Sequence, residues 1–555
     1  MDETNLRMLI VVEKKNNWLF ALILGLMVFG YFWNIGLKPI RGEEPRRALV
    51  AFEMDQTGNY VMPTTHGEVY YAKPPLYNLV VMGFYKVLGS YSLWVVRTPP
   101  IISLFVMGFM IFFFTMYYAN IQVAALVSLL YVLSGDILLF FSLLGEIDLF
   151  YTLIVYLQVI AIFHFFQKKQ YLLLFLVSYF FTFLGLMTKG LPSLPFQAFT
   201  LLVLFIYERK FKMLFYWQHI TGILFFAALT FAYFFSYNQY SDVGPYLTKL
   251  FTESAMRTAL HQGWWAQVLN IFIFPMRLLK IMLPGTLLVL FMVGKPVRKE
   301  VFDNDLLRFS FLFVVANIWV YWFSPDTRDR YVYMFMPFLL TILVHFYVKY
   351  SEESEWANRW MNRMIGVFIG VFLVACVVAP FIHYFEVVSY LWFVVVALLA
   401  LGGFIAYLFA KKKTPKILIV LLLMVALKLW MNGLYVPVQA TYTNRQAILK
   451  HTTNINKIVD KAPVYLTGKA DIDSAVFRIL GHELVDAHFE IPPFLPREYV
   501  YYIVRNNHQL MYYRREEEPN TFYITKKEYL ENRDVEQLYE FTDFMGYGDF
   551  VLYRL

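Results

Sequence analysis

Long apolar stretches, separated by short charged or turn-rich connectors, constrain this chain more than any other feature. A stretch of about 17 to 25 apolar residues can cross the hydrocarbon core of a bilayer as a helix. We predict thirteen spans, at 18–37, 92–117, 121–141, 148–166, 171–188, 192–207, 217–237, 268–291, 306–324, 331–348, 364–382, 388–410 and 417–435. The segment 75–90 is ambiguous. Because only 16% of the residues are charged and 59% are hydrophobic, a polytopic membrane protein is expected rather than a soluble globule.

The connectors between the predicted spans alternate between basic and poorly basic. The basic ones are 167–170, 208–210, 295–308, 349–363 and 411–413. Basic loops stay on the cytoplasmic side, so these loops and the N-terminus are predicted to be cytoplasmic. An odd number of spans then places the C-terminal tail outside. The first span lacks a small-residue cleavage pattern and is expected to be retained as a helix.

The pattern of polar and apolar residues changes near residue 436. Mixed polar and apolar runs follow, with strand-like segments at 463–466, 499–504 and 550–553. We therefore predict a transmembrane domain over 1–435, whose first outer loop is 38–91 and includes an amphipathic stretch. A small α/β domain on the outer face is predicted over 436–555.

Charge and cysteine content exclude several classes of function. The formal net charge is +8, but residues 436–555 hold 14 Lys/Arg against 17 Asp/Glu, which leaves 34 against 23 in the membrane part. That excess sets orientation and can meet lipid phosphates, so no nucleic-acid partner is expected. The single cysteine, Cys376, can form neither an intramolecular disulfide nor a cysteine metal cluster.

Charged residues in the predicted outer connectors are the strongest functional signal, because a charge near a bilayer is costly. They cluster at 41–47, 70–76, 146–148, 188–190 and 325–331. Cationic groups there could neutralise a phosphate, and a carboxylate could take a proton from an attacking hydroxyl. Together they suit a reaction between an anionic lipid headgroup and a nucleophile.

Each cluster also has a structural interpretation. Glu43 and Glu44 before a proline could simply begin an interfacial helix, and Lys189 could simply end one. Arg328 and Arg330 could extend from the membrane edge towards water. Asp148 is harder to explain structurally, because it opens an apolar span with no base next to it in sequence. For Asp148 we favour a functional role.

Six short motifs, in their residues and in their order along the chain, resemble those of a known family. They are Glu43-Glu44-Pro45-Arg46, Thr57-Gly58-Asn59-Tyr60, Tyr70-Tyr71-Ala72-Lys73-Pro74-Pro75, Glu146-Ile147-Asp148, Thr188-Lys189-Gly190 and Arg328-Asp329-Arg330-Tyr331. Over residues 18–435 the chain resembles the GT-C glycosyltransferases that use polyprenyl-phosphate sugars. These are the protein O-mannosyltransferase-like group and its bacterial relative, the aminoarabinose transferase of lipid A.

The resemblance implies roles for particular residues. Glu43 stands where the family has an aspartate, so either Glu43 or Glu44 is the working carboxylate, and Asp148 resembles the second family carboxylate. The residues implied to bind the lipid phosphate of the donor are Lys73, Arg46, Lys189, Arg328, Arg330 and Tyr331.

The resemblance also bears on metal binding. The aminoarabinose transferase has a glutamate before its Lys-Pro, which with a later histidine can bind zinc. This chain has Ala72 at that position, so no complete zinc site is expected. His261, with Glu146, remains open as an acceptor-binding group or as a ligand of a divalent metal. His261 could equally be an ordinary loop histidine.

The sequence thus predicts a membrane glycosyltransferase that moves a sugar from a polyprenyl (undecaprenyl) phosphate to an acceptor at the outer face, with inversion. The acceptor could be lipid A, another glycolipid or glycan, or a protein. The resemblance favours a bacterial inner membrane, and a monomer is expected. Two alternatives remain open, a secondary transporter or flippase of lipid-linked sugars and a transferase of whole glycans from a polyprenyl pyrophosphate.

Overall fold

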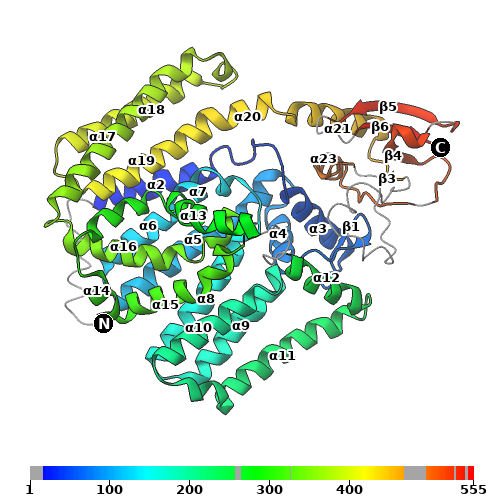
Figure 1. Cartoon of the computed structure of the whole chain (residues 1–555). Helices are drawn as coiled ribbons and strands as arrows, with labels where there is room; N and C mark the ends of the chain where they lie inside the picture. Colours follow the sequence, from blue (N-terminus) through cyan, green and yellow to red (C-terminus); the bar gives the residue numbers. More distant parts are fainter. Residues whose placement is uncertain are drawn as a thin grey trace. The chain divides into compact units, whose positions relative to one another are not determined.

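The computed structural model describes residues 17–256, 264–324, 327–467, 495–514, 516–530, 533–543 and 548–555. These residues are mainly helical, with one four-stranded sheet near the C-terminus (Figure 1). They form two compact units. Unit 1 contains the described residues of 1–38, 71–77 and 97–438, and unit 2 contains those of 39–70, 78–96 and 439–555. The first loop and the C-terminal segment therefore share a unit.

Unit 1 is a set of helices with short connectors. Its α-helices are α2 (Asn17–Phe32), α5 (Leu93–Tyr118, from residue 97 on), α6 (Ile121–Val132), α7 (Gly135–Leu139), α8 (Asp148–Gln167), α9 (Tyr171–Lys189), α10 (Ser193–Tyr207), α11 (Trp217–Tyr237), α12 (Val243–Met256), α13 (Trp264–Ile281), α14 (Val297–Asp303), α15 (Asp305–Trp322), α16 (Met336–Tyr350), α17 (Glu355–Val378), α18 (Leu391–Ala410) and α19 (Lys416–Trp430). The next helix, α20 (Val436–Tyr442), is divided between the two units at residue 439. The 3-10 helices of unit 1 are η1 (Phe141–Leu143), η2 (Phe211–Phe215), η4 (Gly285–Met292), η5 (Asp329–Val332), η6 (Ala379–Phe381) and η7 (His383–Phe385), and η8 (Met431–Tyr435) is a π-helix.

Eight helices among the described residues are long and apolar enough to cross a membrane, or ten if each of two bent pairs counts as one span. The predicted count of thirteen is therefore not confirmed. Three predicted spans correspond to the shorter apolar helices α2, α10 and α16. Helices of 15 or 16 residues rise about 24 Å, which is less than the roughly 30 Å of a hydrocarbon core. The ambiguous segment forms α4 (Leu76–Leu88), which is also short.

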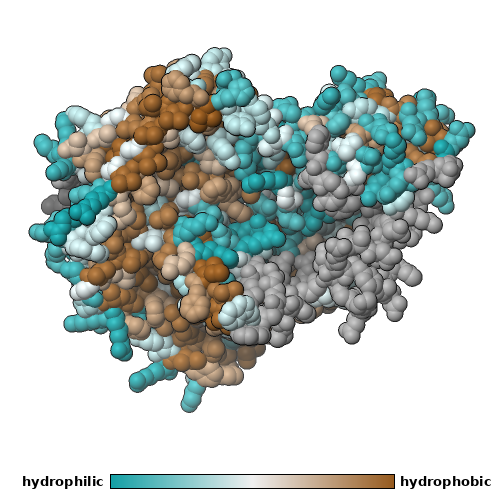
Figure 2. All heavy atoms as spheres, turned by 45° about the horizontal axis from the view of Figure 1, so that its top comes forward, coloured by the Kyte–Doolittle hydropathy of each residue, from teal (hydrophilic) through white to brown (hydrophobic). Residues whose placement is uncertain are grey.

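The helices of unit 1 differ in how deeply they are enclosed. α19 is buried along most of its length, whereas α11, α17 and α18 expose most of theirs. α8 packs against α9, α9 against α11, and α10 against α15. Apolar side chains cover large parts of the protein surface in Figure 2, as expected where helices face lipid.

Unit 2 joins the first loop to the C-terminal segment. The loop supplies α3 (Glu44–Thr57), the strands β1 (Thr64–Thr65) and β2 (Glu68–Val69), and most of α4. α3 ends at Gly58, whose φ of 71° is a left-handed conformation that favours glycine. The C-terminal elements are α21 (Arg445–Val459), β3 (Val464–Leu466), α23 (Arg497–Asn507), β4 (Phe522–Lys526), η9 (Lys527–Leu530), β5 (Glu536–Thr542) and β6 (Asp549–Arg554).

The sheet of unit 2 has the strand order β3-β4-β6-β5. β3 pairs in parallel with β4, and the other two pairs are antiparallel. Two of the predicted strand-like segments lie in β3 and β6. The third, 499–504, is instead the middle of helix α23, so that prediction was wrong. All six of its residues are buried, and such a run lacks the alternation that distinguishes a strand from a buried helix.

A short extended segment links this sheet to the first loop. The N–H of Leu466 donates to the carbonyl of Tyr512 (2.9 Å), and the N–H of Arg514 donates to the carbonyl of Leu466 (2.9 Å). On its other side, the N–H of Tyr513 donates to the carbonyl of His66 (3.1 Å), in the turn between β1 and β2. Gly67 in that turn has a φ of 81°, and an added Cβ would lie 2.7 Å from the Tyr512 ring. The turn therefore fits closely against the C-terminal segment.

Candidate functional site

Asp148 and Lys189 lie together at the ends of two antiparallel helices of unit 1. Asp148 is the first residue of α8 and Lys189 is the last residue of α9, positions where the helix dipole favours those charges. A connector of three residues joins the opposite ends of these helices, which brings Asp148 and Lys189 to the same end of the pair. The Lys189 Nζ lies 2.5 Å from the Asp148 Oδ1. Only 2% of the Asp148 side chain and 9% of the Lys189 side chain are exposed.

Arg330 brings a second cation to the same carboxylate. It belongs to η5, and its Nε lies 3.2 Å from the Asp148 Oδ2. Burial lowers the pKa of Arg330, but the charges of Asp148 and Glu146 outweigh this effect and raise the pKa above its ordinary value. Glu146 is itself buried. We call Asp148, Lys189 and Arg330 the Asp148 cluster.

Aromatic rings surround both cations of the Asp148 cluster. The Lys189 ammonium lies 4.4 Å from the ring centroid of Tyr331 and 5.0 Å from that of Tyr151. The Arg330 guanidinium lies 5.6 Å from the ring of Phe141. Ring faces attract cations without neutralising them, so both groups can still pair with an anion.

Close packing holds α8 and α9 in this arrangement. Gly185 lies one turn before Lys189, and a Cβ there would come within 2.4 Å of the Ser193 hydroxyl oxygen. That hydroxyl donates to the Tyr151 hydroxyl at 3.3 Å. A small residue is thus needed where α9 approaches α10, as is common where membrane helices touch.

Deeper in the same three helices, neutral polar side chains form a buried network. Gln158 on α8 donates to Thr182 on α9 and to Gln197 on α10, each at 2.9 Å. Gln197 in turn donates to the Ser178 hydroxyl at 2.8 Å. This network contains no charged group, and it joins the helices that carry Asp148 and Lys189.

Lys73 belongs to unit 1, in the segment 71–77. Its side chain is half-buried. The end of this segment is fixed beside α8, because the fully buried ring of Tyr77 lies 5.8 Å from that of Phe150, two residues after Asp148. Tyr71 packs against Tyr246 of α12 (6.3 Å).

The remaining charges of the segment around η5 lie apart from Asp148. Arg328 is exposed, and no ion pair joins its side chain to another described residue. Asp329 pairs with Arg277 (3.3 Å) and Lys280 (3.7 Å). Of the two predicted arginines, only Arg330 therefore reaches the Asp148 cluster.

The acidic pair of the first loop belongs to unit 2. Glu43 precedes α3, and its carboxylate lies 2.6 Å from Arg46 and 3.7 Å from Arg47. Arg47 also donates to the Tyr70 hydroxyl at 2.8 Å. Glu44 is fully buried. We call Glu43, Glu44 and Arg46 the acidic turn.

A further buried carboxylate of unit 2 lies outside every predicted motif. Glu53 on α3 accepts hydrogen bonds from the backbone N–H groups of His66 and Gly67 and from the Thr64 hydroxyl. Burial raises the pKa of Glu53 to about 7, against the lowering effect of these hydrogen bonds. The His66 ring donates from Nδ1 to the carbonyl of Met511 (3.1 Å), and burial lowers the pKa of His66 to about 4.

The metal predictions remain predictions. His261 lies outside the described residues. Within the described part of the chain, no group of three or more His, Cys, Asp or Glu side chains could hold a metal ion. Ala72, at the position of a family ligand, is half-buried beside Lys73.

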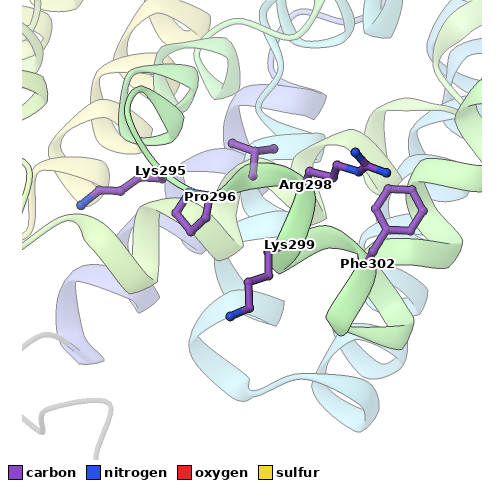
Figure 3. Close-up of a pocket in the computed structure, with 6 residues that line it drawn as sticks. Lys295, Pro296, Arg298, Lys299 and Phe302 are labelled. Atoms are coloured by element: carbon purple, nitrogen blue, oxygen red, sulfur yellow. The ribbon is translucent and has the colours of Figure 1, made fainter.

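One pocket in the described structure lies elsewhere. It has a volume of about 690 Å³ and is lined by Lys295, Pro296, Val297, Arg298, Lys299 and Phe302. None of these is a predicted site residue. In Figure 3 the charged ends of Lys295, Arg298 and Lys299 point in different directions rather than towards one centre. The charged groups of this pocket therefore do not converge on one point, whereas those of the Asp148 cluster do.

Sequence reasoning brought Asp148, Lys189, Arg330 and Tyr331 into one set, and these residues lie together. It missed Phe141 and Tyr151, whose rings line the cluster, and the buried Lys428. On α19, the Lys428 Nζ donates to the carbonyl of Leu138 (2.7 Å) and to the Ser142 hydroxyl (2.9 Å). A lysine inside an apolar span was a usable signal for Lys428, whereas the two aromatic residues are indistinguishable in sequence from lipid-facing ones.

Comparisons with known proteins support the fold. No protein-family model and no curated protein matches the chain. Two crystal structures of ArnT from Cupriavidus metallidurans are similar, one bound to undecaprenyl phosphate (TM-score 0.68, 13% identity) and one in the apo state (TM-score 0.65, 12% identity). The matches cover 97% and 98% of this chain and 98% of each of those chains. The predicted fold class, a mainly helical membrane protein with a small C-terminal sheet, is confirmed.

Proposed function

We propose that this protein is a membrane glycosyltransferase that moves a sugar from a polyprenyl phosphate to an acceptor at the outer face of the membrane. Its N-terminus is cytoplasmic and its C-terminal domain lies outside. The observation that carries the proposal is the convergence of Lys189 and Arg330 on one buried carboxylate, Asp148. The similarity in fold to a protein that binds undecaprenyl phosphate supports the choice of carrier.

The two cations suit a leaving phosphate. Transfer of the sugar breaks the bond between its anomeric carbon and the phosphate oxygen, which leaves negative charge on the phosphate. Lys189 and Arg330 are buried and face aromatic rings, so an anion replaces little of their hydration when it enters. Lys73 and Arg46 are further phosphate-binding candidates from the sequence.

An arriving phosphate also changes the state of Asp148. In this structure its two oxygens pair with Lys189 and Arg330. When the phosphate pairs with either cation, one carboxylate oxygen is released and can orient or deprotonate the acceptor. Attack of the acceptor on the face of the anomeric carbon opposite to the departing phosphate inverts that carbon. If the acceptor nucleophile is itself a phosphate oxygen, no strong base is needed and the carboxylate acts by positioning.

The acceptor is a glycolipid, a glycan or a protein, and the acidic turn is the second place where it could be bound. Glu43 remains partly accessible beside Arg46, whereas Glu44 is fully buried. This difference favours Glu43 as the group that meets a substrate.

The test is mass spectrometry of the lipids that copurify with the full-length protein from its native membrane. Wild type, Arg330→Ala and Lys73→Ala would be compared. A polyprenyl phosphate, free or glycosylated, is expected with wild type and depleted in both variants, because each loses a cation that binds the phosphate. The mass of an attached sugar would identify the donor.

The control is Arg298→Ala, which removes an exposed arginine from the pocket of Figure 3 and should leave the carrier bound. Arg328→Ala tests the exposed arginine next to η5 separately. Equal amounts of carrier in wild type and Arg330→Ala would overturn the assignment of the Asp148 cluster. A different lipid enriched in place of any polyprenyl phosphate would favour a transporter instead.

A further inference from the structure

Lys428 is a buried cation that the proposed transfer reaction does not use. It lies on α19, and no carboxylate of a described residue pairs with it. A charge inside an apolar span is costly, and such residues are rarely kept without a role. The contacts of Lys428 indicate what that role is.

The surroundings of Lys428 account for all three N–H donors of its ammonium group. One donates to the carbonyl of Leu138 (2.7 Å) and one to the Ser142 hydroxyl (2.9 Å). The third is available to the Tyr31 ring, whose centroid lies 5.3 Å from the Nζ. Because the protein itself takes up these donors, Lys428 is suited to hold a segment in place rather than to bind a substrate.

The segment that Lys428 holds is the junction of α7 and η1. α7 ends at Leu139, so the carbonyl of Leu138 is among the last of its helix and needs a partner from outside. The Ser142 hydroxyl donates to the same carbonyl at 2.9 Å. Lys428 thus completes a small network across the break between the two helices. We call residues 135–143 the α7–η1 segment.

The α7–η1 segment contacts the residues around Arg330 at two places. The Phe141 ring lies 5.6 Å from the Arg330 guanidinium and 5.5 Å from the Tyr333 ring. Asp136 accepts a hydrogen bond from the hydroxyl of Tyr333, which is buried. Phe141 is next to Ser142 in the chain. The contact on α19 is therefore linked, through one short segment, to a cation of the Asp148 cluster.

We propose that Lys428 is a positioning residue for the donor phosphate, because it fixes the α7–η1 segment and this segment fixes the orientation of Arg330. The inference rests on the proposed transferase function, in which Arg330 binds the phosphate of the carrier. Arg330 lies near the Phe141 ring and reaches Asp148 with its Nε (3.2 Å). A planar donor group binds an anion well only in a narrow range of orientations, so a shift of Phe141 is expected to weaken phosphate binding.

The effect of losing the Lys428 ammonium should be concentrated at η1. Leu138 and Ser142 are both buried, so water does not replace the lost donor and the junction is expected to move. The hydrogen bond between Asp136 and Tyr333 still holds the other end of the α7–η1 segment. The displacement therefore falls on the part of the segment that carries Phe141.

The experiment titrates full-length protein with farnesyl phosphate and follows binding by native mass spectrometry. Lys428→Met keeps the length of the side chain but removes its donors, and binding should weaken about fivefold, within the range by which residues of one network couple. Lys428→Arg keeps donors and should recover part of the loss. Lys416→Met is the matched control, because Lys416 lies on the same helix and donates to Asn358 (2.8 Å), and it should bind like wild type. Wild-type binding by Lys428→Met would overturn the proposal.

Double variants test whether Lys428 acts through Arg330. In an Arg330→Ala background, Lys428→Met should weaken binding no further, because the group that it positions is gone. In a Lys73→Ala background it should still weaken binding about fivefold, since distant sites contribute additively. The same fivefold loss in the Arg330→Ala background would show that Lys428 acts independently of Arg330 and would overturn the positioning role.

Ser142→Ala keeps the proposal testable if Lys428→Met does not fold. This variant removes one acceptor of Lys428 and leaves the lysine in place. Binding of farnesyl phosphate should weaken about twofold, again only when Arg330 is present. A lower thermal unfolding midpoint with unchanged binding would mean that the network only stabilises the fold, and the positioning role would be wrong.

Arg330→Ala alone separates this inference from the function on which it rests. If Arg330→Ala loses farnesyl phosphate and Lys428→Met binds it like wild type, only the role of Lys428 is wrong. If Arg330→Ala also binds like wild type, the assignment of the Asp148 cluster to the phosphate fails, and the positioning role of Lys428 fails with it.

Discussion

Asp148 in unit 1 and Glu53 in unit 2 are both buried carboxylates, with 2% and 4% exposed, yet their surroundings are opposite. Asp148 lies between the ammonium of Lys189 and the guanidinium of Arg330. Glu53 accepts hydrogen bonds from two backbone N–H groups and a threonine hydroxyl, and no cation pairs with it among the described residues. Similar burial is thus combined with two different means of stabilisation.

We propose that the difference separates a reactive site from a structural one. Lys189 and Arg330 can pair with an incoming phosphate in place of Asp148, because a phosphate and a carboxylate bind the same cations. Backbone amides fixed in a turn cannot leave Glu53, so this carboxyl holds the β1–β2 turn against α3. The pKa of about 7 at Glu53 is a consequence of burial without a counter-charge. Burial alone is therefore a poor guide to catalysis.

The largest expected effect is at Asp148. Asp148→Asn keeps the size of the side chain but removes the charge, and we expect kcat for sugar transfer to fall about a thousandfold, within the range for lost acid–base groups. The measurement is a transfer assay with purified protein. Asp329→Asn is the control, because that carboxylate pairs with Arg277 and Lys280 instead. Normal transfer by Asp148→Asn would remove the contrast with Glu53.

At Glu53 we expect a large effect of pH on stability. Its pKa rises from 4.5 in the unfolded chain to about 7 in the folded one, so the folded state holds the proton more tightly. The stabilisation is complete below pH 4.5, declines as the pH rises and is lost above about pH 7. A difference of this size corresponds to about 3 kcal/mol of unfolding free energy.

His66 has the opposite effect, and the two must be separated. Because its folded pKa is lowered to about 4, its contribution to stability increases as the pH rises from 4 to 6.5. His66→Asn suits the left-handed conformation of that residue (φ 58°) and should reveal the decline caused by Glu53. Glu53→Gln should reveal the increase caused by His66. Thermal unfolding across pH 4 to 8 measures both, and identical pH profiles in wild type and Glu53→Gln would contradict the assignment.

A smaller effect is expected when the geometry of one cation changes. Arg330→Lys keeps the charge but loses the planar donor that contacts Asp148, so we expect binding of a polyprenyl phosphate to weaken about tenfold. Titration with farnesyl phosphate, followed by native mass spectrometry, measures this change. Arg308→Lys is a matched control at another ion-paired arginine, which contacts Glu208 and Asp305.

The smallest effect is expected in the neutral network below the Asp148 cluster. Gln158→Leu removes hydrogen bonds to Thr182 and Gln197, and such bonds between membrane helices contribute about 0.6 kcal/mol on average. A slight decrease in the thermal unfolding midpoint with nearly normal transfer is expected. A loss of activity as large as that of Asp148→Asn would show that the network sets the position of the cluster.

Sequence patterns predicted the parts of this molecule that depend on local physics. Long apolar runs predicted the helices. Charges are costly near a bilayer, so their position at the ends of these runs predicted functional roles for Asp148, Lys189 and Arg330. The sequence predicted the number of spans less well, because α2, α10 and α16 are apolar but short. Apolar content alone does not distinguish a full-length span from a shorter apolar helix.

Contacts between distant segments could not be predicted from the sequence. Nothing local indicated that α23 packs against α3 or that residues 511–513 support the turn at His66. The run 499–504 was predicted to be a strand, because β-branched and aromatic residues suit both a strand and a helix when every side chain is buried. The same lack of alternation concealed the helix that packs against α3.

The support that residues 511–513 give to the first loop has a consequence for synthesis. His66 and Met511 are 445 positions apart, so the turn lacks its C-terminal partner until nearly the whole chain has left the ribosome. At about 5 to 20 residues per second, that interval is roughly 20 to 90 seconds. During it the membrane helices can already assemble, while α3 waits without its C-terminal contacts. A nascent chain would therefore acquire its membrane core first and a fixed acidic turn only at the end of translation.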